Sequence, residues 1–137
     1  VYVHASFEDE PGNRVFRILR ISAGGEVTGS FHAETWGTVP PVVQPDGRII
    51  ICGDFGSWQG TPAPGIVRLN TDGSLDETFR PELARSTNRP YITSAVLDQL
   101  GRLLIVGRFD SVNGEPRPGV ARLFAYEPAQ TSPALTL

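Results

Sequence analysis

The stretch "GRIIICGDFGSWQGTPAPGIVRL", residues 47–69, decides the fold, because a closely related stretch occurs again later in the chain. "GRLLIVGRFDSVNGEPRPGVARL", residues 101–123, aligns with it without a gap at an offset of 54, and twelve of the 23 positions are identical. Similar segments at a fixed offset are the sequence signature of a repeat architecture, in which each copy folds as one unit. The chain is therefore expected to be built from repeated units.

A fainter copy occupies the start of the chain. "VYVHASFEDEPGNRVFRILRI", residues 1–21, aligns with residues 49–69 at an offset of 48. The positions kept in register are Phe7, Gly12, Ile18, Arg20, Gly25 and Phe31. The two offsets differ by six residues, which places an insertion within residues 80–100, a polar and turn-rich stretch where we expect a loop. The three copies then occupy residues 1–31, 39–79 and 91–125.

The most apolar segments of the copies are typical of β-strands covered on both sides. "RIIICG", residues 48–53, and "RLLIVG", residues 102–107, are apolar at consecutive positions, and both are too short and too tightly bounded by glycine for a helix. Strands of a β-sandwich would instead alternate between apolar and polar positions. The pattern therefore favours sheets stacked face to face.

A repeated unit of this length with four short antiparallel strands has the size of one β-propeller blade. The expected fold class is all-β, with about two and a half to three four-stranded antiparallel blades in residues 1–125. Closed propellers have about four to eight blades, so we expect part of a larger or oligomerically closed propeller. The expected partners are further blades from the same longer chain or from other subunits. Residues 126–137 are expected to be a tail or linker, or to hold one closing strand, "ALTL".

Composition and charge exclude several classes of function. The 137 residues are 39% apolar and 20% charged, as in a soluble domain, and 15 glycines with 12 prolines suit many short strands joined by turns. Net charge is −3 with scattered basic residues, so no nucleic-acid partner is expected. The apolar runs are too short for membrane insertion or a signal peptide. The chain has no methionine, so we expect a processed form or an excerpt of a longer protein.

"PDGRIIICGDF", residues 45–55, and "RLNTDGSLDETF", residues 68–79, together with the second copy at 101–123, resemble the delta-60 repeat, a bacterial β-propeller repeat family. The resemblance covers residues 39–79 and 91–123 well and residues 1–31 in outline. It implies a propeller blade in an extracytoplasmic bacterial protein, secreted or attached to the cell surface. It implies no established activity, and no functional residue is carried over from it.

We therefore expect a non-catalytic structural or ligand-presenting segment of a larger bacterial extracytoplasmic protein. Two alternatives stay open: a carbohydrate- or protein-binding propeller that uses loop aromatics, and a hydrolase or lyase with its active site in a propeller channel. No catalytic, cofactor-binding or metal-ligating residue is nominated. His4 and His32 occupy different columns of the repeat, and neither has a nucleophile at a known motif spacing.

Trp58 is the one candidate ligand-binding residue. It falls in the loop between the second and third expected strands, where the other copies have Glu10 and Val112. Exposed aromatic side chains on such loops contact sugars or protein partners. The alternative, that the indole folds over the edge of a blade, has equal weight.

Asn70, Asp72, Ser74 and Asp76 offer oxygen ligands at alternate positions, as a calcium loop does. The spacing lacks the bidentate glutamate of such a loop, and "TDGS" is a strong signal for a tight turn, so we favour the turn.

Two columns of the repeat are expected to pack between blades. One holds arginines whose guanidinium groups would pair with carboxylates or turn carbonyls, in preference to serving as anion receptors. The other holds phenylalanines in the core. The residues are Arg20, Arg68 and Arg122, and Phe7, Phe31, Phe55, Phe79 and Phe109.

Overall fold

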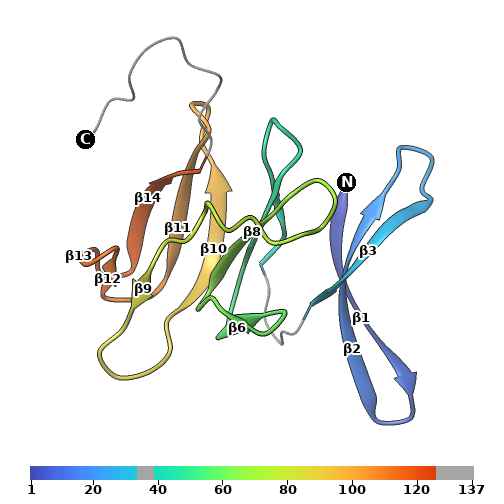
Figure 1. The fold of residues 1–137 in the computed structure, drawn as a ribbon, viewed down its shortest axis with the longest axis horizontal. Helices are drawn as coiled ribbons and strands as arrows, with labels where there is room; N and C mark the ends of the chain where they lie inside the picture. The colour runs from blue at the N-terminus through green and yellow to red at the C-terminus, as the bar shows by residue number, and fades with distance from the viewer. Residues whose placement is uncertain (34–38, 126–137) are drawn as a thin grey trace.

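The computed structural model describes residues 1–33 and 39–125, without the side chains of residues 4, 7, 32 and 33. Its regular secondary structure there is all β-strand, and three antiparallel sheets follow one another across the molecule (Figure 1). In these ranges no helix is long and apolar enough to span a membrane. The all-β prediction is confirmed.

Each main sheet has three strands. The first contains β1 (Tyr2–Glu10), β2 (Asn13–Ile21) and β3 (Val27–Ala33), in that order. The second contains β4 (Val42–Val43), β5 (Ile49–Cys52) and β8 (Ile66–Leu69), and the third β10 (Tyr91–Leu97), β11 (Arg102–Arg108) and β14 (Val120–Phe124). Two small sheets are formed by β6 (Ser57–Trp58) with β7 (Thr61–Pro62), and by β13 (Glu115–Pro116), β12 (Ser111–Val112) and β9 (Leu83–Ala84).

The repeat in the sequence is a repeat of one long hairpin. Its tip lies at Gly12, Gly60 and Gly114, three aligned glycines with φ of +84°, +78° and +78°. Only glycine adopts such a φ without strain, which is why the tip glycine recurs in all three copies. In the first copy the hairpin is continuous, as β1 and β2. In the second and third copies it bends, so that its tip forms a small sheet of its own.

The main sheets have three strands where four were expected, and the bend gives the second and third copies additional small sheets. Gly65 and Gly119, with φ of +79° and +75°, turn the returning strand before it rejoins the main sheet as β8 or β14. The tip of the third copy pairs with β9, so the insertion expected as a loop contains a short strand. In the first sheet, β3 takes the place where the second copy has a single bridge between Leu69 and Leu75.

The hydrophobic core lies between the sheets and consists of two clusters. One lies between the first and second sheets: Ile18, Ile49, Ile51, Phe55, Trp58, Val67 and Leu69. The other lies between the second and third sheets and includes Ile50, Cys52, Ile66, Phe79, Leu83, Ile92, Leu103, Ile105 and Phe109. Alternate residues of β5 therefore enter different clusters, and all four are buried. The prediction that this strand is covered on both faces is confirmed.

Strand β11 behaves differently from β5. Leu103 and Ile105 are fully buried against the second sheet, whereas Val106 on the opposite face is 39% exposed. In the described part of the chain no sheet lies beyond the third one (Figure 1). The expectation that residues 103–106 of β11 are buried on both faces is therefore not met in the described structure, because only one face of this strand has a neighbouring sheet.

Gly73 and Gly25 occupy equivalent turns, with φ of +89° and +88°. A Cβ at Gly73 would lie 2.1 Å from the Phe31 ring, whereas a Cβ at Gly25 would meet nothing within 4 Å. We expect Gly73→Ala to lower the free energy of unfolding by about 1 kcal/mol or more beyond Gly25→Ala, because only Gly73→Ala adds a steric clash to the same backbone strain. Equal losses in urea titrations of the two variants would contradict the contact between the first and second sheets.

Candidate functional site

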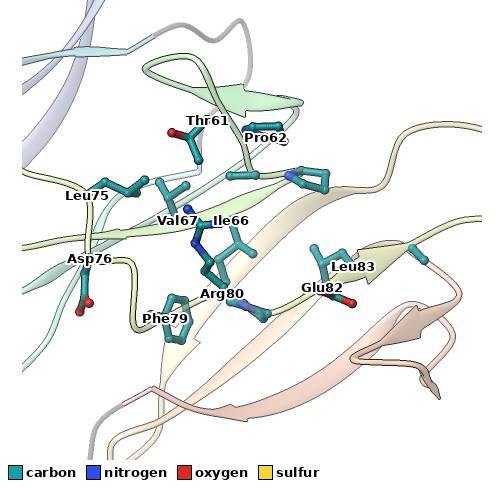
Figure 2. Close-up of a pocket in the computed structure, with 14 residues that line it drawn as sticks. Thr61, Pro62, Ile66, Val67, Leu75, Asp76, Phe79, Arg80, Glu82 and Leu83 are labelled. Carbon is teal, nitrogen blue, oxygen red and sulfur yellow. The ribbon is translucent and has the colours of Figure 1, made fainter.

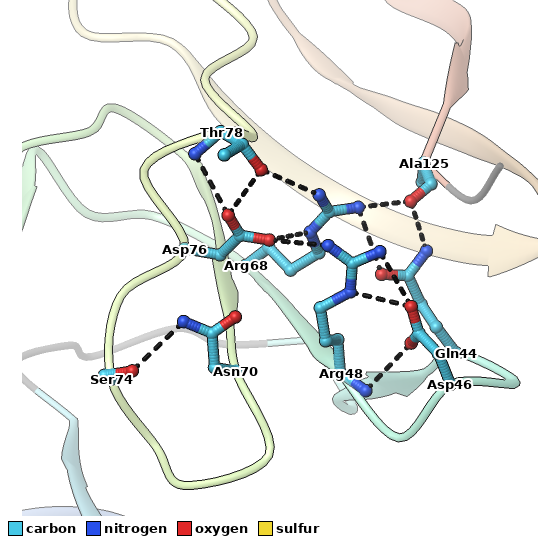
Figure 3. Close-up of polar contacts among 9 residues, drawn as sticks. All are labelled: Gln44, Asp46, Arg48, Arg68, Asn70, Ser74, Asp76, Thr78 and Ala125. Atoms are coloured by element: carbon cyan, nitrogen blue, oxygen red, sulfur yellow. Dashed lines mark hydrogen bonds and ion pairs between the residues drawn. The ribbon is translucent and has the colours of Figure 1, made fainter.

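The most elaborate polar cluster surrounds Arg68, in the middle of β8 (Figure 3). Its Nε donates a hydrogen bond to Asp76 Oδ2 at 2.8 Å, and its Nη1 donates to Gln44 Oε1 at 3.3 Å and to the carbonyl of Ala125. The guanidinium also lies over the Phe79 ring, 4.6 Å from its centroid. Since Ala125 directly follows β14, the arginine connects the second and third sheets.

The carboxylate of Asp76 is the centre of this cluster. Thr78 donates to Oδ1 through its backbone N and its hydroxyl, at 3.0 and 2.5 Å, and Arg48 Nη1 donates to Oδ2 at 2.9 Å. Burial by itself would raise the pKa of Asp76, but these hydrogen bonds and those from the arginines outweigh it and lower the pKa to about 2. At neutral pH the carboxylate is ionised and fully engaged, so its role is structural and not that of a general acid or base.

The stretch at residues 70–76 forms a turn. Gly73 has φ of +89° and its N–H donates to the Asn70 carbonyl, while the Asp72 carboxylate accepts the N–H of Ser74 at 2.9 Å. The Asn70 amide donates to the Ser74 hydroxyl at 3.0 Å, and Asp76 turns away toward the arginines. The four side chains therefore do not converge on one point, which supports the turn interpretation over a calcium loop. Residues 1–33 and 39–125 contain no cluster of three or more His, Cys, Asp or Glu suited to a metal ion.

The arginine column has different partners in each copy. Arg68 is buried and ion-paired, as expected from the sequence. Arg20 donates to the hydroxyl and carbonyl of Thr28, the residue equivalent to Asp76. Arg122 is half exposed, and its Nε lies 3.9 Å from Asp98. Of the three arginines, only Arg68 is both buried and paired with a carboxylate, and it belongs to the sheet that has a neighbouring sheet on each side.

Trp58 lies on β6 and is fully buried, with 0% of its surface exposed. Its ring is 5.7 Å from that of Phe55, and both belong to the cluster between the first and second sheets. Val112, the equivalent residue of the third copy, is also buried. The position thus matches the packed alternative, and a ligand would reach the indole only if the β6–β7 hairpin moved. Glu10, the equivalent residue of the first copy, is exposed, so the repeat by itself did not decide between the two alternatives.

The indole N–H of Trp58 is exceptional, because it is buried and has no hydrogen-bond partner among the described residues. An unsatisfied buried donor is unfavourable, so packing of the ring must outweigh this effect.

The other residues that the sequence singles out are either packed in the core or outside the described part of the structure. Phe55, Phe79 and Phe109 are buried, as expected, and Phe31 packs against the first cluster. Burial raises the pKa of the Cys52 thiol, so no reactive thiolate forms there. The side chains of Phe7, His4 and His32, and the whole of Trp36 and residues 126–137, lie outside the described part of the structure.

A pocket that the sequence did not indicate lies between the β6–β7 hairpin and residues 75–84 (Figure 2). It encloses about 360 Å³. Its apolar walls include Pro62, Pro64, Ile66, Leu75, Phe79 and Leu83, and its charged lining residues are Asp76, Arg80 and Glu82. Because Arg68 and Arg48 hold Asp76, Arg80 and Glu82 are the charged groups that a ligand could meet.

The ion pair of Arg68 and Asp76 makes stability depend on pH. The folded-state pKa of Asp76 lies below its ordinary value of 3.8, so its contribution is complete above about pH 5 and is lost as the pH falls toward 2. We expect Asp76→Asn to lower the free energy of unfolding by about 3 kcal/mol at neutral pH, because Arg68 is left buried without a counter-charge. In urea titrations, the difference from the parent chain should shrink by about 2 kcal/mol on acidification.

Asp54→Asn is the matched control, because it removes an exposed ion pair, the one with Arg89 at 2.6 Å. We expect it to change stability by less than about 1 kcal/mol. If the two substitutions had equal effects, the Arg68 cluster would not be a special contact between sheets.

Trp58→Ala should lower the free energy of unfolding by about 3–5 kcal/mol, because it leaves a cavity between the first and second sheets. Trp58→Phe should have a smaller effect, since it keeps most of the ring and removes the unpaired N–H. Thermal unfolding monitored by circular dichroism measures both. A Trp58→Ala chain as stable as the parent would show that the indole is not packed.

Comparison with known proteins fits this geometry. Residues 44–79 and 101–125 match the model of a family described as a domain of unknown function (DUF5122), beta-propeller. Searches of curated proteins and of solved structures each gave no match. The two matched segments hold β5 to β8 of the second copy and β11 to β14 of the third, and they leave out β4 and β10. The chain is therefore an all-β protein with a β-propeller domain, and two of its three copies match the DUF5122 family.

Proposed function

We propose that this chain is a non-catalytic structural or ligand-presenting segment of a β-propeller, completed at both ends by further blades of the same repeat. Those blades belong either to the same longer chain or to other subunits. The resemblance of residues 45–55 and 68–79 to the delta-60 repeat supports the finer assignment to a bacterial extracytoplasmic protein. The proposal depends mainly on one observation, namely that among the described residues both outer sheets carry exposed apolar side chains on their outward faces.

The open face of the third sheet, here called the tail face, consists of Leu104, Val106 and Val120. Val106 and Val120 are 39% and 52% exposed, and Leu104 is half-buried. At the offset of 54 these residues correspond to Ile50, Cys52 and Ile66, which are buried between the second and third sheets. The tail face thus repeats a surface that is covered by a sheet one copy earlier.

The open face of the first sheet, here called the head face, consists of Val1, Val3, Leu19 and Ile21. Val1 and Val3 are 84% and 36% exposed, and the other two are half-buried. At the offset of 48 they correspond to Ile49, Ile51, Val67 and Leu69, all buried between the first and second sheets. The head face therefore repeats the other half of the same kind of interface.

A head face and a tail face are two complementary halves, and they meet at both internal boundaries of this chain. Exposed apolar faces of this kind mark interaction surfaces, and a head-to-tail contact adds units until a ring closes. Blades of the same repeat are therefore the partners with the right chemistry. Such a partner blade needs aliphatic side chains at alternate positions of two neighbouring strands.

The non-catalytic part of the proposal is supported by the state of the reactive groups. Asp76 is held by two arginines, and the Cys52 thiol is buried with a raised pKa. His4 and His32 lie on β1 and β3, at positions that do not pair in register with one another. No observation favours the hydrolase or lyase alternative, and burial of Trp58 gives no support to glycan binding through that ring.

We expect the purified chain to self-associate or to bind a separately supplied blade segment, and Val106→Lys and Val3→Lys each to weaken that association about tenfold or more, because a charge is buried on one half of the interface. Size-exclusion chromatography with light scattering over a range of concentrations measures the effect. Leu100→Lys is the control, since Leu100 is an exposed apolar residue in a turn outside both faces. A chain that stays monomeric and binds no apolar dye would contradict the proposal.

A further inference from the structure

We propose that the pocket between the β6–β7 hairpin and residues 75–84, here called the Arg80 pocket, binds a carboxylate carried on a small apolar body. The proposal goes beyond completion of the propeller, because this pocket includes no residue of the head face or the tail face. It rests on the unused hydrogen-bond donors of Arg80, on the apolar walls, and on a difference between the copies.

Arg80 has hydrogen-bond donors without an acceptor. Its nearest acidic group in the described structure is Glu77, 3.9 Å from Nη2, and both side chains are more than half exposed. No hydrogen bond from the Arg80 guanidinium to any described residue occurs. Figure 2 shows this side chain extending from its loop across the pocket toward β8. A guanidinium placed in this way is suited to bind a carboxylate through two parallel hydrogen bonds.

The other charged groups of the lining leave room for an anion. Asp76 accepts hydrogen bonds from Thr78, Arg68 and Arg48, and Figure 2 shows its carboxylate directed away from the pocket. Glu82 lies beside Leu83, and neither carboxylate oxygen is within ion-pairing distance of Arg80. Arg80 is therefore the cationic group among the charged lining residues, and its donors are the groups with which a carboxylate would pair.

The walls select an apolar body of small size. Pro62, Pro64 and Pro81 contribute rigid rings, and Leu75 and Phe79 add aliphatic and aromatic surface. A volume of about 360 Å³ accommodates a branched aliphatic or single-ring group with a carboxylate. Rigid apolar walls lose little conformational freedom on binding. The same chemistry is found in a free aliphatic acid and in the C-terminal residue of a peptide.

One wall position of the pocket differs among the three copies of the repeat. Ala63, a small residue in its wall, corresponds to Val15 in the first copy and Arg117 in the third. A larger side chain at this position would occupy the space that Ala63 leaves open. Ala63→Arg, which introduces the side chain found at this position in the third copy, should therefore close the pocket.

The experiment compares N-acetyl-leucine, its uncharged analogue N-acetyl-leucinamide, and 4-methylpentanoate as a free acid. Binding is followed by two-dimensional NMR of the full chain, through the amide signals of Ala63, Leu75 and Ala84. We expect N-acetyl-leucine to bind about tenfold or more tightly than the amide, because only the acid pairs with Arg80. Equal shifts from both acids would identify a free acid as sufficient, and shifts from N-acetyl-leucine alone would identify a peptide end.

Arg80→Gln should weaken binding of N-acetyl-leucine about tenfold or more, and Ala63→Arg should abolish the shifts. Arg108→Gln, which changes an exposed arginine outside the pocket, is the matched control and should bind like the parent. Val106→Lys should also bind like the parent, so that loss of blade association and loss of ligand binding are separate results. Equal binding of acid and amide, or equal competition by inorganic phosphate, would overturn the proposal.

Discussion

Strand β5 carries apolar side chains at four consecutive positions, and the pleat of a strand directs them alternately to opposite faces. Both faces must then be removed from water, so one sheet has to lie on each side. The first sheet covers Ile49 and Ile51, and the third covers Ile50 and Cys52. Stacking of three sheets is the direct consequence, and the two core clusters exist because of it.

The Arg68 cluster is the polar counterpart of this stacking. A buried guanidinium is tolerated only if its donors and its charge are satisfied, and here Asp76, Gln44 and the Ala125 carbonyl do so from different elements. The carbonyl directly follows β14, the last strand of the third sheet. Arg122, the equivalent of Arg68 in the third copy, is half exposed, and no described sheet follows the third one. The polar contacts of this arginine and the apolar contacts of its sheet therefore both require a following sheet.

The elements that sequence analysis placed well are those governed by local pattern. The hairpin tips at Gly60 and Gly114, the turn at Gly73 and the buried run of β5 each follow from a few adjacent residues. The Arg80 pocket was missed, because its walls come from the β6–β7 hairpin and a loop about 15 residues later, and no local pattern records that they meet. Trp58 illustrates the same limit, since its sequence position left exposure and packing with equal weight, and its burial depends on the cluster between the first and second sheets.

The sequence by itself determined that this protein is made of repeated β-hairpins with strands apolar on both faces, because the period of the repeat and the pattern of side chains are properties of the chain. Tertiary structure decided which of those faces are covered, that the hairpins bend into separate small sheets, and that Arg80 faces a pocket. These features depend on which neighbouring segment packs against each residue, and contacts between segments distant in sequence are not encoded in any one of them.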